Sequence, residues 1–170
     1  LSSSAALESV FALALNKLFS LSIDNLELAK IGQRAEHNYA GVKCGIMDQF
    51  VSIQGKKGHV IRLDCRSLDF EYFPLELGEY VLILVDTKVK HSLASSEYNR
   101  RRHECDEGVM ILRSQMPAVR SLRDVRPKDV YPYKGMMGEK IFMRCEYVTE
   151  ENERVLDTCE ALAKGDLKRV

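Results

Sequence analysis

The stretch that most constrains the fold is residues 3–21, which predicts a helix that is apolar almost all the way round. A helix on a protein surface normally carries apolar side chains on one face only. This helix is therefore expected inside a core, and the serines at its start supply N-cap hydroxyl groups. Its apolar positions are Ala5, Ala6, Leu7, Val10, Phe11, Leu13, Ala14, Leu15, Leu18 and Phe19.

The rest of the chain mixes helical and strand patterns. A second helix is predicted from Asp24, with Glu27 three residues later as in a capping box, to about His37. Glycines at 41 and 45 interrupt the pattern that follows. Residues 59–63 alternate as in a strand, and the aromatic residues near 70–75 predict its partner.

Three further elements complete this prediction. The aliphatic run 80–85 indicates a buried strand. Long helices are predicted at 93–115 and 139–163, the second stopped by Gly165. Since helices and strands do not alternate steadily, the fold class is predicted as α+β.

Composition excludes several kinds of partner. The 170 residues carry a formal net charge of +0, which gives no global reason to bind nucleic acid or anionic lipid. Apolar stretches are too short or too interrupted to span a bilayer, so no membrane partner is expected. The five cysteines are spread out without a CxxC pair, which favours reduced thiols and a cytoplasmic location.

A serine-rich helix start is the first candidate for chemistry. Ser2, Ser3 and Ser4 precede a helix whose first N–H groups are unpaired, where phosphate oxygens are stabilised and a hydroxyl can reach a metal ion. A serine at this position can equally be an ordinary cap.

Two carboxylates are the next candidates. Glu36 can be a solvated surface group, whereas Asp48 stands among large apolar residues and needs a partner or a function if it is buried.

The arginines 100–102 follow Tyr98 on the predicted helix 93–115. Adjacent helical residues lie about 100° apart, so a salt-bridged face is favoured over a phosphate fork. His91 and His103 have no companion at metal-ligand spacing and are interpreted as structural.

Four segments resemble the galactokinases, within the GHMP superfamily of small-molecule kinases. LSSSAA alone indicates the superfamily, while CGIMDQF together with HSLASSEY is specific to galactokinases and their nearest relatives. Looser similarity continues to residue 170. The segments are LSSSAALE at 1–8, AEHNYAGVKCGIMDQF at 35–50, GHVIRLDCRSL at 58–68 and VKHSLASSEYNRRRHE at 89–104.

The resemblance implies a function and a role for each matching residue. The implied reaction transfers the γ-phosphoryl group of ATP to the C1 hydroxyl of galactose, with Mg²⁺ as cofactor. Ser2 and Ser3 match the phosphate-binding loop, and Ser4 and Glu36 match metal ligands. Gly45, Asp48 and Tyr98 match sugar-contacting residues, and Asp48 also matches the proposed catalytic base.

The resemblance also implies a partial two-lobed architecture, with residues 1–78 in the N-terminal lobe and 79–170 in the C-terminal lobe. The family's first sugar-binding motif, its catalytic arginine and its third, glycine-rich motif are not found in these residues. The chain is therefore expected to be part of a longer, monomeric kinase, and to be inactive or prone to self-association by itself. Two alternatives stay open: a kinase for a related sugar such as N-acetylgalactosamine or arabinose, and a non-catalytic galactose and ATP sensor.

Overall fold

The protein is described by a computed structural model that covers residues 2–86, 88 and 94–170. The chain forms two compact units, Leu1–Lys90 and His91–Val170, and each is described by itself. Both helices and strands are present, as the α+β prediction requires. The lobe boundary at residue 78 stays a prediction.

The first unit contains helices and one β-hairpin. Asp24 accepts a hydrogen bond from the Glu27 N–H and caps the second helix, as its sequence predicts. The strands pair antiparallel, with His59 opposite Pro74 and Leu63 opposite Phe70. The elements are α1 (Ser3–Leu18), α2 (Asn25–Ala35), the π-helix η1 (Glu36–Ala40), α3 (Met47–Gln54), β1 (His59–Leu63) and β2 (Phe70–Pro74).

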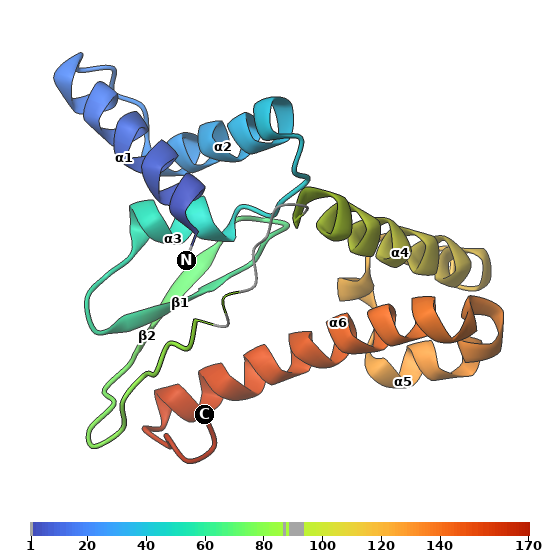
Figure 1. The fold of residues 1–170 in the computed structure, drawn as a ribbon. Coiled ribbons are helices and arrows are strands. Elements are labelled where there is room, and N and C mark those ends of the chain that lie inside the picture. The colour runs from blue at the N-terminus through green and yellow to red at the C-terminus, as the bar shows by residue number, and fades with distance from the viewer. Residues whose placement is uncertain (1, 87, 89–93) are drawn as a thin grey trace. The chain divides into compact units, whose positions relative to one another are not determined.

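Helix α3 joins the helices to the hairpin (Figure 1). Phe50 is 1% exposed, and its ring lies edge-on to that of Phe70, with 5.1 Å between centroids. Ala29 and Ile46 complete the buried cluster, against which side chains of β1 pack. The core of this unit therefore lies where α2, α3 and β1 meet.

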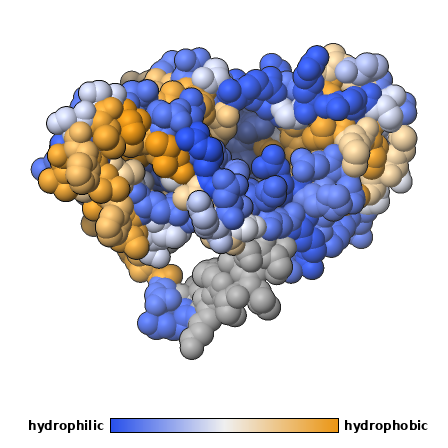
Figure 2. All heavy atoms as spheres, turned by 90° about the horizontal axis from the view of Figure 1, so that it is seen from above, coloured by the Kyte–Doolittle hydropathy of each residue, from blue (hydrophilic) through white to orange (hydrophobic). Residues whose placement is uncertain are grey.

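The prediction that residues 3–21 lie inside a core is wrong for this chain. Only Ala5 and Ser9 of α1 are buried, because the described residues of the unit cover one narrow side of the helix. Figure 2 shows apolar residues gathered on the side of the unit where α1 lies. Its large exposed side chains are Leu7, Val10, Phe11, Leu15 and Leu18.

The predicted strand at 80–85 is also absent from the described residues. Residues 81–85 are 76–80% exposed and adopt no regular structure. A strand needs a neighbour to accept and donate its backbone hydrogen bonds. In the described residues the sheet contains only β1 and β2, and neither pairs with this segment.

The second unit is helical. Its buried cluster includes Leu112 of α4 and Phe142 and Cys145 of α6. Gly108 allows close approach of the two helices, since a Cβ there would stand 2.1 Å from the Cys145 Sγ. The elements are α4 (Ala94–Gln115), the 3-10 helix η2 (Leu122–Asp124), α5 (Pro127–Val130), the 3-10 helix η3 (Tyr131–Tyr133) and α6 (Lys134–Ala163).

The predicted limits of the last helix are confirmed. Gly138 has φ 69° and ψ 164°, so α6 contains a kink there and its unbroken part starts at 139. The helix ends at Ala163, followed by Gly165 at φ 70°. Left-handed backbone of this kind favours glycine. None of the helices found in the described residues is both long and apolar enough to cross a bilayer.

Ion pairs cover α4, as predicted for the arginine run. Arg100 lies 2.6 Å from Glu97, and Arg102 lies 3.6 Å from Asp106. Glu104 is 6% exposed and binds two cations of α6, Lys140 at 2.5 Å and Arg144 at 2.9 Å. Hydrogen bonds from Lys140 and Arg144 lower the pKa of Glu104 to about 2.

Candidate active site

The serine-rich segment forms the start of α1. Ser2 has φ 47° and ψ 39°, a left-handed conformation that is uncommon outside glycine. Its side chain makes no capping hydrogen bond to the described residues, and Ser2, Ser3 and Ser4 are exposed. The predicted N-cap hydroxyl is therefore absent. The first N–H groups of the helix face solvent at its positive end, which suits an anion.

Glu36 starts η1 and is 8% exposed. Short π-helical turns are rare and are frequent at functional sites. The Glu36 carboxylate lies near that of Glu8 on α1. Burial, and secondly the negative charge of Glu36, raise the pKa of Glu8. Two acidic side chains thus share a poorly hydrated position beside the first turns of α1.

Two side chains of the α2–η1 region hold the backbone next to Gly45. The Gln33 amide donates to the Cys44 carbonyl at 3.2 Å, and the His37 Nε2 lies 2.8 Å from the same oxygen. A carbonyl only accepts, so His37 carries its proton on Nε2 in this contact. Gly45 itself is exposed, and a Cβ there would meet no atom within 4 Å.

Asp48 occupies the first turn of α3 and is half-buried. The positive end of the helix favours a carboxylate at this position. The charges of Asp48, Glu36 and Glu8 also act on one thiol, that of Cys44. Burial and the nearby charge of Glu36 raise the pKa of Cys44, with smaller contributions from Glu8 and Asp48. The three carboxylates therefore lie in one neighbourhood of the first unit.

Tyr98 lies on α4 in the second unit, where its side chain is 43% exposed. Because the two units are described separately, its predicted role in binding the sugar stays a prediction. His91 falls outside the described residues. His103 lies 3.1 Å from Glu107 on the same helix, in keeping with a structural role.

The acidic neighbourhood suits a hard divalent cation. The Glu8 Oε2 is buried without a hydrogen-bond partner among the described residues, which leaves negative charge uncompensated. No set of three metal-binding side chains occurs in the part of the chain that the structure describes. Mg²⁺ commonly takes one or two protein oxygens and completes its shell with phosphate and water. Ser4 and Glu36 fit such a partial set.

Sequence reasoning missed Glu8 and Gln49. Gln49 is 2% exposed, and its Cγ and the Glu8 Oε2 both lie within 4 Å of the position that a Cβ at Gly32 would take. Glu8 lies within LSSSAALE and Gln49 within CGIMDQF, so both stand inside the matched segments. A polar residue beside apolar Phe50 was the one local signal for a buried amide.

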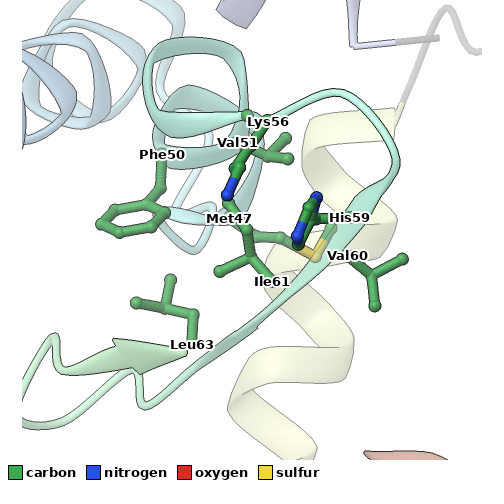
Figure 3. A pocket seen from close by; sticks show the side chains of 9 residues that line it. Met47, Phe50, Val51, Lys56, His59, Val60, Ile61 and Leu63 are labelled. Atoms are coloured by element: carbon green, nitrogen blue, oxygen red, sulfur yellow. The ribbon is translucent and has the colours of Figure 1, made fainter. Parts of the chain in front are cut away.

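An apolar pocket lies between α3 and β1 (Figure 3). It has a volume of about 490 Å³, and its lining includes Met47, Phe50 and Ile61. Lys56 and His59 are its polar members, and none of the predicted site residues lines it. It offers no carboxylate for acid–base chemistry, so it is not the predicted reaction site.

Comparison with known proteins defines the class. Residues 1–56 match the family described as "GHMP kinases N terminal domain". These residues contain the serine-rich helix start, Glu36, Gly45 and Asp48. Residues 1–56 accordingly belong to the GHMP kinase N-terminal domain family.

Within that class the relatives are galactokinases. The chain is 46% identical over 168 residues to the galactokinase of Thermotoga maritima, covering 99% of this chain and 45% of that protein. It is 41% identical over 170 residues to that of Chloroflexus aggregans, covering 100% and 43%. The chain thus spans less than half the length of these relatives.

A solved structure agrees with this result. The crystal structure of Lactococcus lactis galactokinase complexed with galactose matches with a TM-score of 0.89 and 31% identity. The match covers 96% of this chain and 42% of that chain. The chain is therefore a homologue of galactokinases and has part of their fold.

Proposed function

We propose that the protein containing this chain transfers the γ-phosphoryl group of ATP to the C1 hydroxyl of galactose. The observation that carries the proposal is the match of residues 1–56, which include the serine-led start of α1, Glu36 and Asp48, to the GHMP kinase N-terminal domain. The relatives named galactokinase, and the galactose with which the Lactococcus lactis enzyme is complexed, support the choice of sugar. The five cysteines are all reduced, which supports a cytoplasmic location.

In this reaction each group has a distinct task. The N–H groups and hydroxyls at the start of α1 hold phosphate oxygens, since they stand at the positive end of the helix. Ser4 and Glu36 hold Mg²⁺, which neutralises phosphate charge when bound. Gly45 leaves room for the sugar, and Tyr98 donates a hydrogen bond to it.

Asp48 acts on the acceptor. Its carboxylate takes the proton of the C1 hydroxyl as that oxygen forms a bond to the γ-phosphorus. The bond between the γ-phosphorus and the bridging oxygen then breaks, and ADP leaves with the electron pair. General-base assistance of this kind contributes roughly 10²–10⁴-fold.

Replacement of Asp48 tests the proposal. In the protein as its gene encodes it, with any residues that flank this chain, Asp48→Asn should lower galactose-dependent ADP release by roughly 10²–10⁴-fold. Nucleotide binding measured by calorimetry should persist, because the start of α1 is unchanged. The matched control is Asp69→Asn, an exposed aspartate of the same unit, which should leave turnover unchanged.

Two outcomes would overturn the proposal. One is an Asp48→Asn variant that phosphorylates galactose as fast as the unmodified protein. The other is an unmodified protein that releases no ADP with galactose. Such a protein could instead release ADP with N-acetylgalactosamine or arabinose, or could bind galactose and ATP without turnover. The 170 residues alone should be inactive or nearly so in the same assay.

A further inference from the structure

A short loop carries the chain from η1 to α3. Residues 41–46 have no regular structure. Gly41 begins the loop with φ 71°, and the Cys44 N–H donates to the Val42 carbonyl at 2.8 Å, which makes a tight turn. Because such a loop has few backbone hydrogen bonds of its own, side chains from elsewhere set the direction of its peptide groups.

Two side chains converge on one oxygen of this loop. The Gln33 Nε2 lies 3.2 Å and the His37 Nε2 2.8 Å from the Cys44 carbonyl oxygen. Gln33 and His37 are four residues apart, so they stand on the same face of α2 and η1. A carbonyl oxygen has two lone pairs and can accept from both donors at once. All three residues are half-buried, which shields the two bonds from part of the surrounding water.

The direction of this carbonyl decides where the next N–H group points. In a planar trans peptide group, the Gly45 N–H points away from the Cys44 C=O. The carbonyl faces α2 and η1, so the Gly45 N–H faces the opposite side. This N–H has no hydrogen-bond partner among the described residues, and Gly45 is exposed. Gln33 and His37 therefore aim a backbone donor away from the two helices.

The core holds the other end of the loop. Ile46 is 5% exposed and belongs to the buried cluster, and its carbonyl accepts from the Phe50 N–H at 2.9 Å. Asp48 follows Ile46 by two residues, in the first turn of α3, and takes its place from this anchor. Gly45 lies between the two anchored points. Loss of the anchor at Cys44 would therefore turn Gly45 relative to Asp48.

We propose that Gln33 and His37 are positioning residues, which hold the Cys44 carbonyl by two hydrogen bonds. These bonds align Gly45 with Asp48 for the sugar, and neither side chain touches the reacting atoms. The inference rests on the proposed function, in which Gly45 and Asp48 meet the sugar while the start of α1 holds the nucleotide. The pair should therefore act on galactose and not on ATP.

Single and double substitutions test the pair, made in the protein with any flanking residues. Gln33→Met and His37→Phe each remove one donor and keep the approximate size of the side chain. Since either bond alone can hold the carbonyl, each should lower kcat/KM for galactose by only about threefold. The double variant should lower it by roughly 10²-fold, which is more than the product of the single effects, because both bonds end on one oxygen. His37→Gln, made in the Gln33→Met background, returns an N–H donor near the place of the imidazole Nε2 and should restore the kcat/KM of Gln33→Met alone.

Two readouts separate positioning from a general loss of stability. The dissociation constant of galactose, measured by calorimetry, should rise several-fold in the double variant, while that of ATP should stay unchanged. Tyr72→Phe is the matched control, because it removes one hydrogen bond of 2.6 Å to the Gln54 carbonyl at the other end of α3. This control should lower the melting temperature and leave kcat/KM unchanged.

A measurement on the unmodified protein covers the case in which the double variant does not fold. A carbonyl only accepts, so the His37 Nε2 must carry a proton to make its bond. Nitrogen NMR of the imidazole in alkaline solution should therefore show the proton on Nε2 and not on Nδ1.

Three results would refute the inference. The first is a double variant that keeps kcat/KM for galactose within about threefold of the unmodified protein. The second is a double variant in which ATP binding weakens as much as galactose binding. The third is a His37 proton on Nδ1. An unmodified protein without galactose turnover instead overturns the proposed function, so the two failures are distinguishable.

Discussion

Helices α4 and α6 approach closely at Gly108, so Gly108→Ala should lower the stability of the helix pair. A second substitution at Cys145 should remove or reverse that effect. In Gly108→Ala, the new Cβ would stand 2.1 Å from the Cys145 Sγ, which is about 1.3 Å short of the 3.4 Å where ordinary contact begins. Cys145 is fully buried, so its sulfur has no open space to enter. The two helices must separate.

The magnitude follows from two opposing effects. Alanine in place of a helical glycine stabilises by about 1 kcal/mol, while forcing atoms into a packed core costs about 1–3 kcal/mol. We expect Gly108→Ala to destabilise the helix pair by up to about 2 kcal/mol. Cys145→Ala removes the sulfur and leaves the Cys145 Cβ 3.9 Å away and the Ile141 Cγ2 3.2 Å away, a contact that a shift of a few tenths of an ångström relieves. In that background the same substitution should be neutral or stabilising by up to about 1 kcal/mol.

Amide hydrogen exchange of α4 and α6 measures this directly, because it reports the opening free energy of these helices by themselves. The quantity of interest is the difference between the two backgrounds, about 2 kcal/mol. A Gly108→Ala penalty that is the same with and without the Cys145 sulfur would refute the steric argument.

Two further predictions concern titratable groups of the second unit. The pKa of Glu104 in the folded protein is about 2, below its value near 4.3 in an unfolded chain. The contribution of Glu104 to stability is therefore full above about pH 4.3 and is lost as the pH falls towards 2. Glu104→Gln should remove this part of the pH dependence of hydrogen exchange in α4 and α6, and an unchanged pH profile would contradict the prediction. Burial raises the pKa of the Cys145 thiol to about 12. A thiol reagent at pH 8 should therefore modify the exposed Cys65 and leave Cys145 unmodified until the unit unfolds. Mass spectrometry of the digested protein measures the modification of each cysteine.

Elements with local signals could be predicted from the sequence. Strand β1 coincides with the alternating residues 59–63, and the unbroken part of α6 coincides with 139–163. In both cases turn or cap residues next to the element fix its limits. Helix α3 was missed because it has eight residues, follows Gly45 closely and starts without a side-chain cap. The segment 80–85 was misassigned because a strand depends on a neighbour, which its own residues do not specify.

The candidate site likewise contains residues that the sequence indicates and residues that it does not. Ser2–Ser4, Glu36, Gly45, Asp48 and Tyr98 could be named because they stand in motifs of a known family. Glu8 could not be named, since an acidic residue on a helix is ordinarily solvated. Its surroundings appear only in the fold, where α1 packs on α3 and brings Glu8 near Gln49, which is 41 positions away in the chain.

In the acidic neighbourhood of the first unit, buried carboxylates lower the stability of the fold. Glu36 is buried, Glu8 carries an unpaired buried oxygen, and both raise the pKa of Cys44. Like charges at such a position weaken the fold, and apolar residues of similar volume would remove the repulsion. In the second unit the buried carboxylate of Glu104 instead has two cations beside it. One chain thus neutralises a buried acid where only packing is required, and among the described residues it leaves two acids without a cation where phosphate and metal are proposed to bind. That contrast is the physical reason to look for the chemistry at α1, η1 and α3.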